Sequence, residues 1–387
     1  MLNNGICLFR TFHARVASSM LKYSDGVKAM KVVIAAGGTG GHIYPALALA
    51  DILKKTRPET EILFFGSSGR MEAEVIPAHG YRFHGEEMTG TNGGISAKVH
   101  SLLSLVKAGR HCRKLLKEEK PDICVGFGNY ISVPLILAAH RMHIPTMIHE
   151  QNSFAGKANR LLSRYCDAIV TCYASNEEQM PKEKIRLLGN PQATTAADTH
   201  YDAEDGAKAG LDPAKPFVLV MMGSLGSESV SKIIDEACGM LDEDYQVIIA
   251  AGRDNEYQFV HTDSSRHIVV PFVDGKKMLK GCEAAVLRAG ATTMAEIGAI
   301  GCAAILIPSP YVPNNHQYYN AAEYADKDAA ILLEEKDLSA EKLAQTLNAL
   351  MKDPERRETL RRNTKKAGKA DAAYRMIEWM EELADGR

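Results

Sequence analysis

The clearest chemical signal in the chain lies where an apolar run meets a group of glycines. Residues 31–36 read KVVIAA, the segment GGTGG follows at 37–41, and His42 comes immediately after it. Glycine lets a backbone turn tightly or approach a ligand closely. An imidazole with its ordinary pKa near ~6.5 suits proton abstraction near neutrality. A lone histidine is more often a capping or packing residue. On a glycine turn at the carboxyl end of a strand, where open α/β sheets bind ligands, a function is favoured for His42.

A second glycine loop repeats the pattern, because the run FVLVMM at 217–222 leads into GSLGS at 223–227. Such loops present backbone N–H groups that bind anionic oxygen. Neither is a P-loop, which requires Lys and then Ser or Thr after its last glycine. The dinucleotide fingerprint also fails, because Ile43 stands where its third glycine belongs and the second strand ends Phe64-Phe65-Gly66 without a carboxylate. A nucleotide-dependent oxidoreductase is therefore disfavoured, and a flavin or nicotinamide absorbance would revive it.

Two further segments carry groups that suit a sugar nucleotide. Glu296 stands inside the helix that follows the glycine turn of the run RAGATTMAE, and its carboxylate could accept both hydroxyls of a ribose. The segment PNNHQYYNA at 313–321 gathers amide and imidazole groups suited to sugar hydroxyls. The alternatives are a solvated helix glutamate and a capping or turn segment.

The elements that must position these residues alternate along the chain. Strands that alternate with helices predict parallel sheets covered on both faces, hence an α/β fold with two Rossmann-like, doubly wound domains. The predicted strands are 31–36, 61–66, 122–127, 145–149, 167–172, 217–222, 245–251, 267–271, 283–288 and 303–307, and clear helical periodicity covers 98–119, 228–241 and 338–351.

The predicted boundaries follow the same pattern. Residues 1–29 form an extension excluded from the fold, because Met30 directly precedes the first strand. We expect a first domain over 30–190, a hinge at Gly189-Asn190-Pro191, and a second domain over 191–370. Residues 371–387 have an amphipathic pattern and are expected to pack back on the first domain.

Composition excludes several classes of protein. The 387 residues carry a formal net charge of −2, which gives no global signal for nucleic acid. The eight cysteines are scattered without CxxC pairs, as expected for reduced core residues and not for disulfides or zinc ligands. No run approaches the ~20 apolar residues of a membrane span.

These motifs together resemble the MurG family, which transfers N-acetylglucosamine (GlcNAc) from UDP-GlcNAc to lipid I in peptidoglycan synthesis. The resemblance runs from about Lys31 to the C-terminus. GGTGGH alone would leave open relatives such as plastid galactolipid synthases, and the HEQN segment narrows the choice. The motifs are GGTGGHIYPALALA, GSSGRMEAEVIP, HEQN at 149–152, GNP at 189–191, GSLG at 223–226, RAGATTMAEI at 288–297, and His316-Gln317 before Asn320.

The resemblance implies a GT-B fold, two domains facing a cleft, with the acceptor on the first domain and the donor mainly on the second. It implies inverting transfer to the C4 hydroxyl of MurNAc, which forms lipid II, with no cofactor, no metal, and UDP-GlcNAc as a substrate. It assigns His42 as the general base. Acceptor or phosphate contacts would be Thr39, Gly40, Gly41, Asn152 and Asn159, and donor contacts Ser224, Leu225, Gly226, Phe272, Val273, Arg288, Ala291, Thr292, Glu296, His316 and Gln317.

One position departs from the family pattern. Members usually continue GNPVR, whereas Ala193 stands where the arginine is expected to help hold phosphate. Lys215, Lys276 and Arg288 are the alternative cations. This departure keeps open a UDP-sugar-binding protein without activity, beside another UDP-sugar transferase that acts on a lipid acceptor. Only turnover separates these readings.

A lipid acceptor requires a membrane surface, which predicts a peripheral protein on the cytoplasmic face of the cell membrane. Phe154 to Arg164 mixes apolar and basic side chains suited to anionic phospholipid, and its resemblance to the family's membrane-facing region favours docking there. The segment 98–119 is equally consistent with docking and with a solvated helix face. Proteins of cell-wall synthesis are possible further partners. The docking residues are Phe154, Lys157, Arg160, Leu161 and Arg164.

Overall fold

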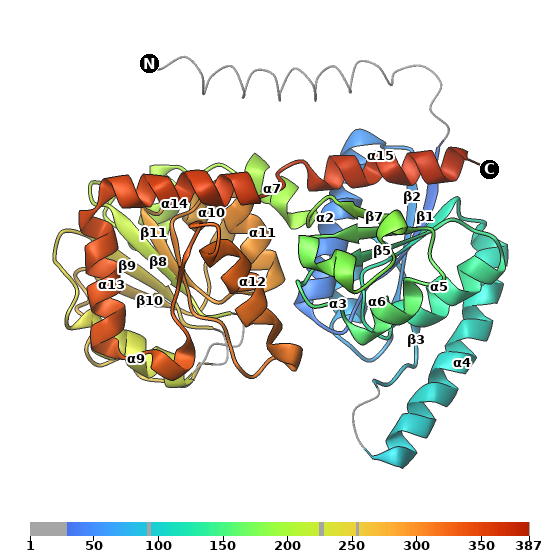
Figure 1. The fold of residues 1–387 in the computed structure, drawn as a ribbon, viewed down its shortest axis with the longest axis horizontal. Coiled ribbons are helices and arrows are strands. Elements are labelled where there is room, and N and C mark those ends of the chain that lie inside the picture. Colours follow the sequence, from blue (N-terminus) through green and yellow to red (C-terminus); the bar gives the residue numbers. More distant parts are fainter. Residues whose placement is uncertain (1–28, 91–93, 224–227, 253–254, 387) are drawn as a thin grey trace.

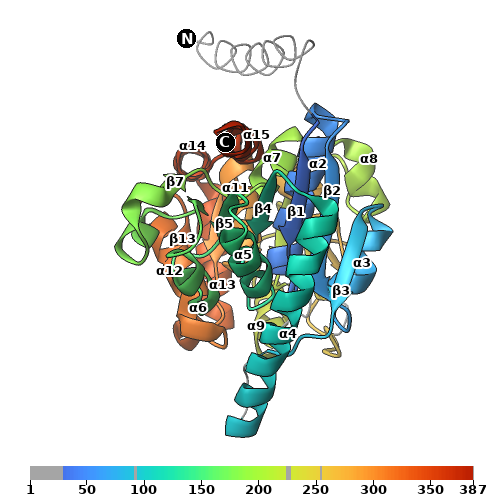
Figure 2. The ribbon, with the colours of Figure 1, turned by 90° about the vertical axis from the view of Figure 1, so that its right-hand side faces the viewer.

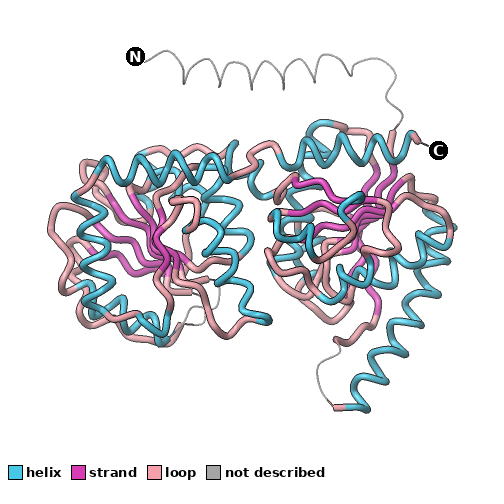
Figure 3. Tube along the Cα trace, viewed as in Figure 1, coloured by secondary structure: helices cyan, strands magenta, loops and turns pink. Residues whose placement is uncertain are grey.

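The computed structural model describes residues 29–90, 94–223, 228–252 and 255–386, and it folds them into two α/β domains that lie side by side (Figure 1). In each domain a parallel sheet runs through the middle, with helices on both faces (Figure 3). This confirms the predicted fold class. The extension up to residue 28 and the loop residues Ser224, Leu225 and Gly226 lie outside the described residues.

The first sheet has a crevice where its strand order reverses. All neighbouring strands are parallel, and the order reverses between β1 and β4, so the crevice at their carboxyl ends is the expected binding site of a doubly wound sheet. The loops after these two strands are residues 36–39 and 127–131. The order is β3 (Arg82–Glu86), β2 (Glu61–Ser67), β1 (Lys31–Ala35), β4 (Ile123–Gly126), β5 (Thr146–Glu150), β6 (Ala168–Thr171) and β7 (Ile185–Leu187).

The helices of the first domain differ in how much they bury. α2 buries nine of its 17 residues against the sheet. α4 extends away from the domain (Figure 2): Cys112 and Leu116 in its second half are buried, whereas Leu102, Leu103 and Val106 are exposed. No described helix is long and apolar enough to span a bilayer. The helices are α2 (Gly40–Thr56), α3 (Glu72–Ala78), α4 (Ile95–Glu119), α5 (Ser132–Arg141) and α6 (Lys157–Leu162).

The second domain repeats this plan. Its parallel strands reverse order between β8 and β11, which places residues 222–223 and 288–290 at the crevice. The order is β10 (His267–Val270), β9 (Gln246–Ala250), β8 (Phe217–Met221), β11 (Ala284–Leu287), β12 (Ala304–Leu306) and β13 (Ile331–Leu332). The helices are α8 (Ala203–Lys208), α9 (Glu228–Cys238), α10 (Gly275–Gly281), α11 (Ala291–Ile300), α12 (His316–Ala325), α13 (Ala340–Lys352) and α14 (Pro354–Ala367).

The chain passes between the domains twice, at neighbouring points. The first passage is at Gly189, whose φ of 89° requires glycine, and it leads into α7 (Gln192–Asp198), which contacts both α2 and α11. The second passage precedes α15 (Ala372–Asp385), which returns to pack along α2 (Figure 1). A Cβ on Gly189 would meet the Lys369 side chain at 2.5 Å, so the two passages touch.

α15 completes the core of the first domain. Ala373, Met376 and Trp379 join the cluster that contains the buried side chains of β1 and α2. Arg57 at the end of α2 also pairs with Glu381, at 2.7 Å from Nε to Oε1.

Candidate active site

His42 lies in the first turn of α2, at the crevice of the first sheet. Its Nδ1 is 2.8 Å from the Oγ1 of Thr39, the residue that precedes the helix. The other side of the ring lies against Gly128 in the loop after β4, where an added Cβ would come within 3.4 Å of Nε2. Gly128 has a φ of +84°, a conformation that favours glycine.

The surroundings of His42 keep the imidazole neutral. Burial lowers its pKa to about 4, and the charge of His316 adds to the effect. His316 is the first residue of α12, in the second domain. A neutral imidazole has a lone pair available for a proton at physiological pH.

Glu72 fixes the glycine loop, and sequence reasoning missed it. Its fully buried carboxylate accepts hydrogen bonds from the N–H of Gly38 at 2.9 Å and of Ser67 at 3.1 Å. A Cβ on Gly37 would lie 2.3 Å from Oε1, so the loop passes directly over the carboxylate. The N–H of Gly38 is therefore engaged, and the N–H groups with no acceptor inside the helix are those of Gly40 and Gly41 in the first turn of α2.

The HEQN segment spans the end of β5 and the start of the loop that follows, and its glutamate, Glu150, holds that loop in place. The Glu150 carboxylate accepts from the N–H of Asn152 at 3.0 Å, the N–H of Gly156 at 2.9 Å and the Nδ2 of Asn159 at 2.8 Å. Burial raises the pKa of Glu150. The Asn159 amino group also donates to the His149 carbonyl, whereas its buried Oδ1 has no partner among the residues described. Acceptor contacts of Asn152 and Asn159 stay predictions.

The start of α12 presents the predicted sugar contacts. The backbone reaches it through Asn314 and Asn315, both with φ near the left-handed value that asparagine tolerates (55° and 50°). The Nδ1 of His316 is 2.8 Å from the Pro313 carbonyl, and the Oε1 of Gln317 accepts the Ser309 N–H at 2.9 Å. These bonds fix both side chains at the domain boundary.

Glu296 lies in the middle of α11, in an electrostatic setting that favours protonation. Burial raises its pKa to about 7, with Lys276 opposing and Asp274 adding to the shift. Phe272, matched to the uracil segment by the resemblance, is 64% exposed, whereas Val273 is buried. Ala291 and Thr292 form the first turn of α11 at the same crevice.

The three candidate cations occupy different places. Arg288 is nearly buried and pairs with Glu335 at 2.7 Å. Lys215 lies before the start of β8, at the edge of the sheet opposite the crevice. Lys276 lies beside Glu296, with its Nζ 3.4 Å from the Gln192 Oε1. The donor contact of Arg288 stays a prediction, and Lys276 is the candidate whose charge lowers the pKa of Glu296.

Ala193 itself has a packing role. It is 1% exposed and packs with Ala196 and Ala299 where α7 meets α11. Ala193 also lines a small hollow of about 40 Å³ together with Ala291 and Met294.

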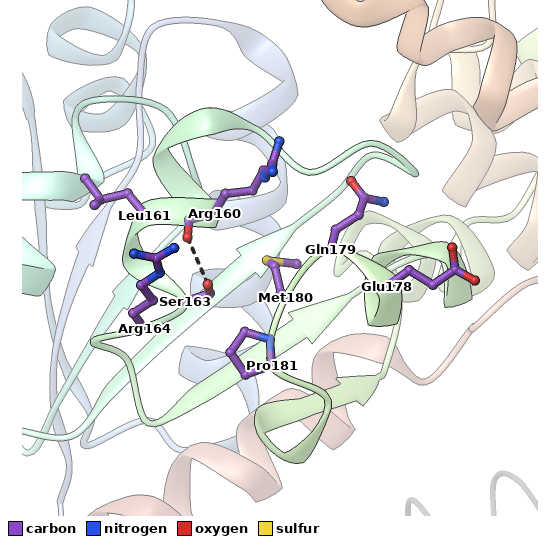
Figure 4. Close-up of a pocket in the computed structure, with 8 residues that line it drawn as sticks. All are labelled: Arg160, Leu161, Ser163, Arg164, Glu178, Gln179, Met180 and Pro181. Carbon is purple, nitrogen blue, oxygen red and sulfur yellow. Dashed lines mark hydrogen bonds between the residues drawn. The ribbon is translucent and has the colours of Figure 1, made fainter.

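The predicted docking residues lie on α6 or within three residues of its ends, and all five are exposed. A hollow of about 550 Å³ opens beside this helix. Figure 4 shows Arg160, Leu161 and Arg164 on its helical side and the segment 178–181 on the facing side.

Comparisons with known proteins agree with this architecture. Residues 32–171 match the Glycosyltransferase family 28 N-terminal domain, and residues 217–376 match the Glycosyltransferase family 28 C-terminal domain. A UDP-N-acetylglucosamine–N-acetylmuramyl-(pentapeptide) pyrophosphoryl-undecaprenol N-acetylglucosamine transferase of Limosilactobacillus fermentum is 36% identical over 356 residues, covering 90% of this chain and 97% of its own. The enzyme of the same name from Listeria monocytogenes (strain EGD-e) is 37% identical over 359 residues, covering 90% and 98%.

Solved structures share the fold at lower identity. Acinetobacter baumannii MurG superposes with a TM-score of 0.73 at 22% identity, over 91% of this chain and 99% of its own. A UDP-N-acetylglucosamine 2-epimerase superposes with 0.66 at 14% identity, over 94% and 98%. Enzymes named for other reactions therefore share this fold. The two matched domains and the near-complete coverage of relatives above 35% identity show that this chain belongs to the MurG family, within glycosyltransferase family 28.

Proposed function

We propose that this chain transfers GlcNAc from UDP-GlcNAc to the C4 hydroxyl of MurNAc in lipid I, with inversion at the anomeric carbon, to form lipid II. One structural observation carries the proposal. His42 stands at the crevice of the first sheet, and α12 of the second domain, which begins at His316, is held to the first domain by the bond from the Ser153 N–H to Asn320, at 3.0 Å. A base and a sugar contact from different domains therefore face one reaction centre.

The chemistry is a single displacement. The acceptor oxygen attacks the anomeric carbon opposite UDP, the sugar–phosphate C–O bond breaks, and its electron pair leaves with the diphosphate. His42 accepts the acceptor's proton at Nε2, with Nδ1 held by Thr39. A neutral imidazole suits this step, and general-base catalysis of this kind contributes roughly 10²–10⁴-fold to a rate.

The second domain would hold the donor. Glu296 as a carboxylate would accept both ribose hydroxyls, and Lys276 favours that charged form. Charge develops on the departing diphosphate, and backbone N–H groups at the crevice together with the Lys276 ammonium suit its stabilisation without reorganisation. In this assignment Lys276 supplies the positive charge that the family's arginine would provide at position 193, where this chain has alanine.

We also assign the docking surface to the exposed residues of 154–164 together with the tip of α4. Phe154 and Leu161 are 37% and 45% exposed, and Leu102 and Leu103 on α4 are 62% and 63% exposed. Apolar side chains beside basic ones suit the interface of an anionic bilayer, here the cytoplasmic leaflet that carries lipid I.

The test is incorporation of radiolabel from UDP-GlcNAc into a lipid I analogue, with UDP-galactose as a matched donor. Transfer of GlcNAc alone supports the assignment. Preferential transfer of galactose would favour another UDP-sugar transferase. UDP-GlcNAc binding without any transfer, in folded protein, would favour a binding protein without activity.

A further inference from the structure

One side chain of the second domain holds the acceptor-side loop of the first. Asn320 is fully buried, and its Oδ1 accepts hydrogen bonds from the N–H of Ser153 at 3.0 Å and from the Ser153 hydroxyl at 2.9 Å. Its Nδ2 donates to the Ala289 carbonyl at 3.2 Å and lies 3.4 Å from the Asn152 Oδ1. Ala289 belongs to the turn after β11, so Asn320 connects the ligand-side loops of both domains.

The position of Asn320 in its helix matters. It follows His316 by four residues and Gln317 by three, and this spacing places side chains on one face of a helix. The first turn of α12 carries the sugar contacts implied by the resemblance, and the next turn carries Asn320. A donor that shifts or orders the start of α12 must therefore act on the Asn320 bonds.

The loop that receives these bonds is stiff on its other side. The Ser153 carbonyl accepts from the Nε2 of Gln179 at 2.8 Å and from the Nδ2 of Asn176 at 3.2 Å. The Asn152 N–H is held by Glu150. Because these bonds tie the loop to the body of the first domain, the bonds of Asn320 to Ser153 set where α12 lies relative to this loop.

We propose that Asn320 is a positioning residue that couples occupancy of the donor site to the placement of the acceptor loop, residues 152–156. The proposal rests on the proposed function for the identity of donor and acceptor. Asn320 touches neither the reacting atoms nor, on this assignment, the sugar. It sets the distance between the two domains' contributions to one site, and an error of about 1 Å in such placement costs about 10²-fold in rate.

The test compares Asn320→Ala with Ser153→Ala, which removes only the hydroxyl bond and leaves the second domain intact. The matched control is Asn348→Ala. Asn348 makes three comparable hydrogen bonds, all inside the second domain, with Asp242, Tyr245 and Met240. Each variant is measured for UDP affinity, for acceptor kcat/KM at saturating donor, and for hydrogen exchange of residues 152–156 with and without UDP-GlcNAc.

For Asn320→Ala we expect acceptor kcat/KM to fall about 10- to 100-fold, with UDP affinity within about threefold of the original protein. Exchange in 152–156 should rise, and UDP-GlcNAc should no longer slow it. Ser153→Ala should show the same changes at smaller size, and Asn348→Ala none of them. Unchanged exchange and unchanged acceptor kcat/KM in Asn320→Ala would overturn the proposal, as would equal effects in Asn348→Ala.

The exchange measurement separates this proposal from the proposed function. If the original protein transfers no GlcNAc to lipid I, the function fails. Slower exchange of 152–156 on binding UDP-GlcNAc, abolished by Asn320→Ala, would still establish the coupling. If the original protein transfers GlcNAc but UDP-GlcNAc does not slow the exchange of 152–156, the proposed function stands and the coupling is refuted.

Discussion

Glu72→Gln is the sharpest test of how the glycine loop is held. The substitution keeps the shape of the side chain but leaves one oxygen for the two N–H groups that now share the carboxylate, those of Gly38 and Ser67. One bond changes from charged to neutral, and the other N–H faces an amino group inside the core. With hydrogen bonds to charged groups worth about 1.5–3 kcal/mol and an unsatisfied buried group costing about 1–3 kcal/mol, the loss is about 2–5 kcal/mol in the native loop.

The catalytic consequence follows from the position of the loop. Gly38 precedes His42 by only four residues, so a loop that relaxes also moves the imidazole. We therefore expect acceptor kcat/KM to fall about 10²-fold. UDP affinity should change little, because the donor contacts lie in the second domain. Glu74→Gln is the control, because Glu74 is exposed on the same short helix. Steady-state kinetics and urea unfolding of both variants decide the matter. Normal acceptor kinetics in Glu72→Gln would refute the reasoning.

Three further predictions concern the base, the ribose contact and the membrane. In ligand-free protein, NMR of labelled histidine should show His42 titrating near pH 4 and its pKa rising when the anionic UDP binds; a ligand-free midpoint near 6.5 would contradict the lowered pKa. Glu296→Ala should weaken UDP binding by about 1.5–3 kcal/mol in calorimetry. In the unsubstituted protein affinity should fall as pH drops through about 7, because the carboxylate is then protonated; a pH-independent affinity would return Glu296 to a packing role. Removing the charges of Lys157, Arg160 and Arg164, each worth about 1 kcal/mol at an anionic surface, should release the protein from anionic vesicles in co-sedimentation, as should salt. Activity on a short-chain, soluble acceptor should survive, and binding indifferent to both changes would assign docking to another surface.

Most of the strands that sequence predicted are buried on both faces, and β10, a partly exposed edge strand, is the exception. β1 and β4 are continuous apolar runs, and such runs are visible without any knowledge of the partner strand. β3, β7 and β13 were not predicted. β3 reads RFHGE and is largely half-exposed at the sheet edge, and β13 has two residues. Edge strands this short and polar carry no period that sequence alone reveals.

The site divides in a similar way. His42 could be predicted, because its glycine loop and its place after a strand are local in sequence. Glu72 could not, because its role depends on Gly38, 34 residues away, and nothing local separates it from the exposed Glu74. The pairing of Arg288 with Glu335 could not be predicted either, because the two residues are 47 positions apart and meet only through packing.

The return of α15 has a consequence for the order in which the protein is completed. Domains generally finish folding in the order of their synthesis. Here the first domain's core lacks Ala373, Met376, Ile377 and Trp379 until the end of the chain has been made. The second domain's strands and helices end with α14 at Ala367, so its core can close earlier. During translation the first domain therefore cannot complete its core until α15 has been synthesised, and the apolar surface of α2 stays uncovered until then. A chain cut short by a dozen residues would lose the stability of its first domain and keep that of its second.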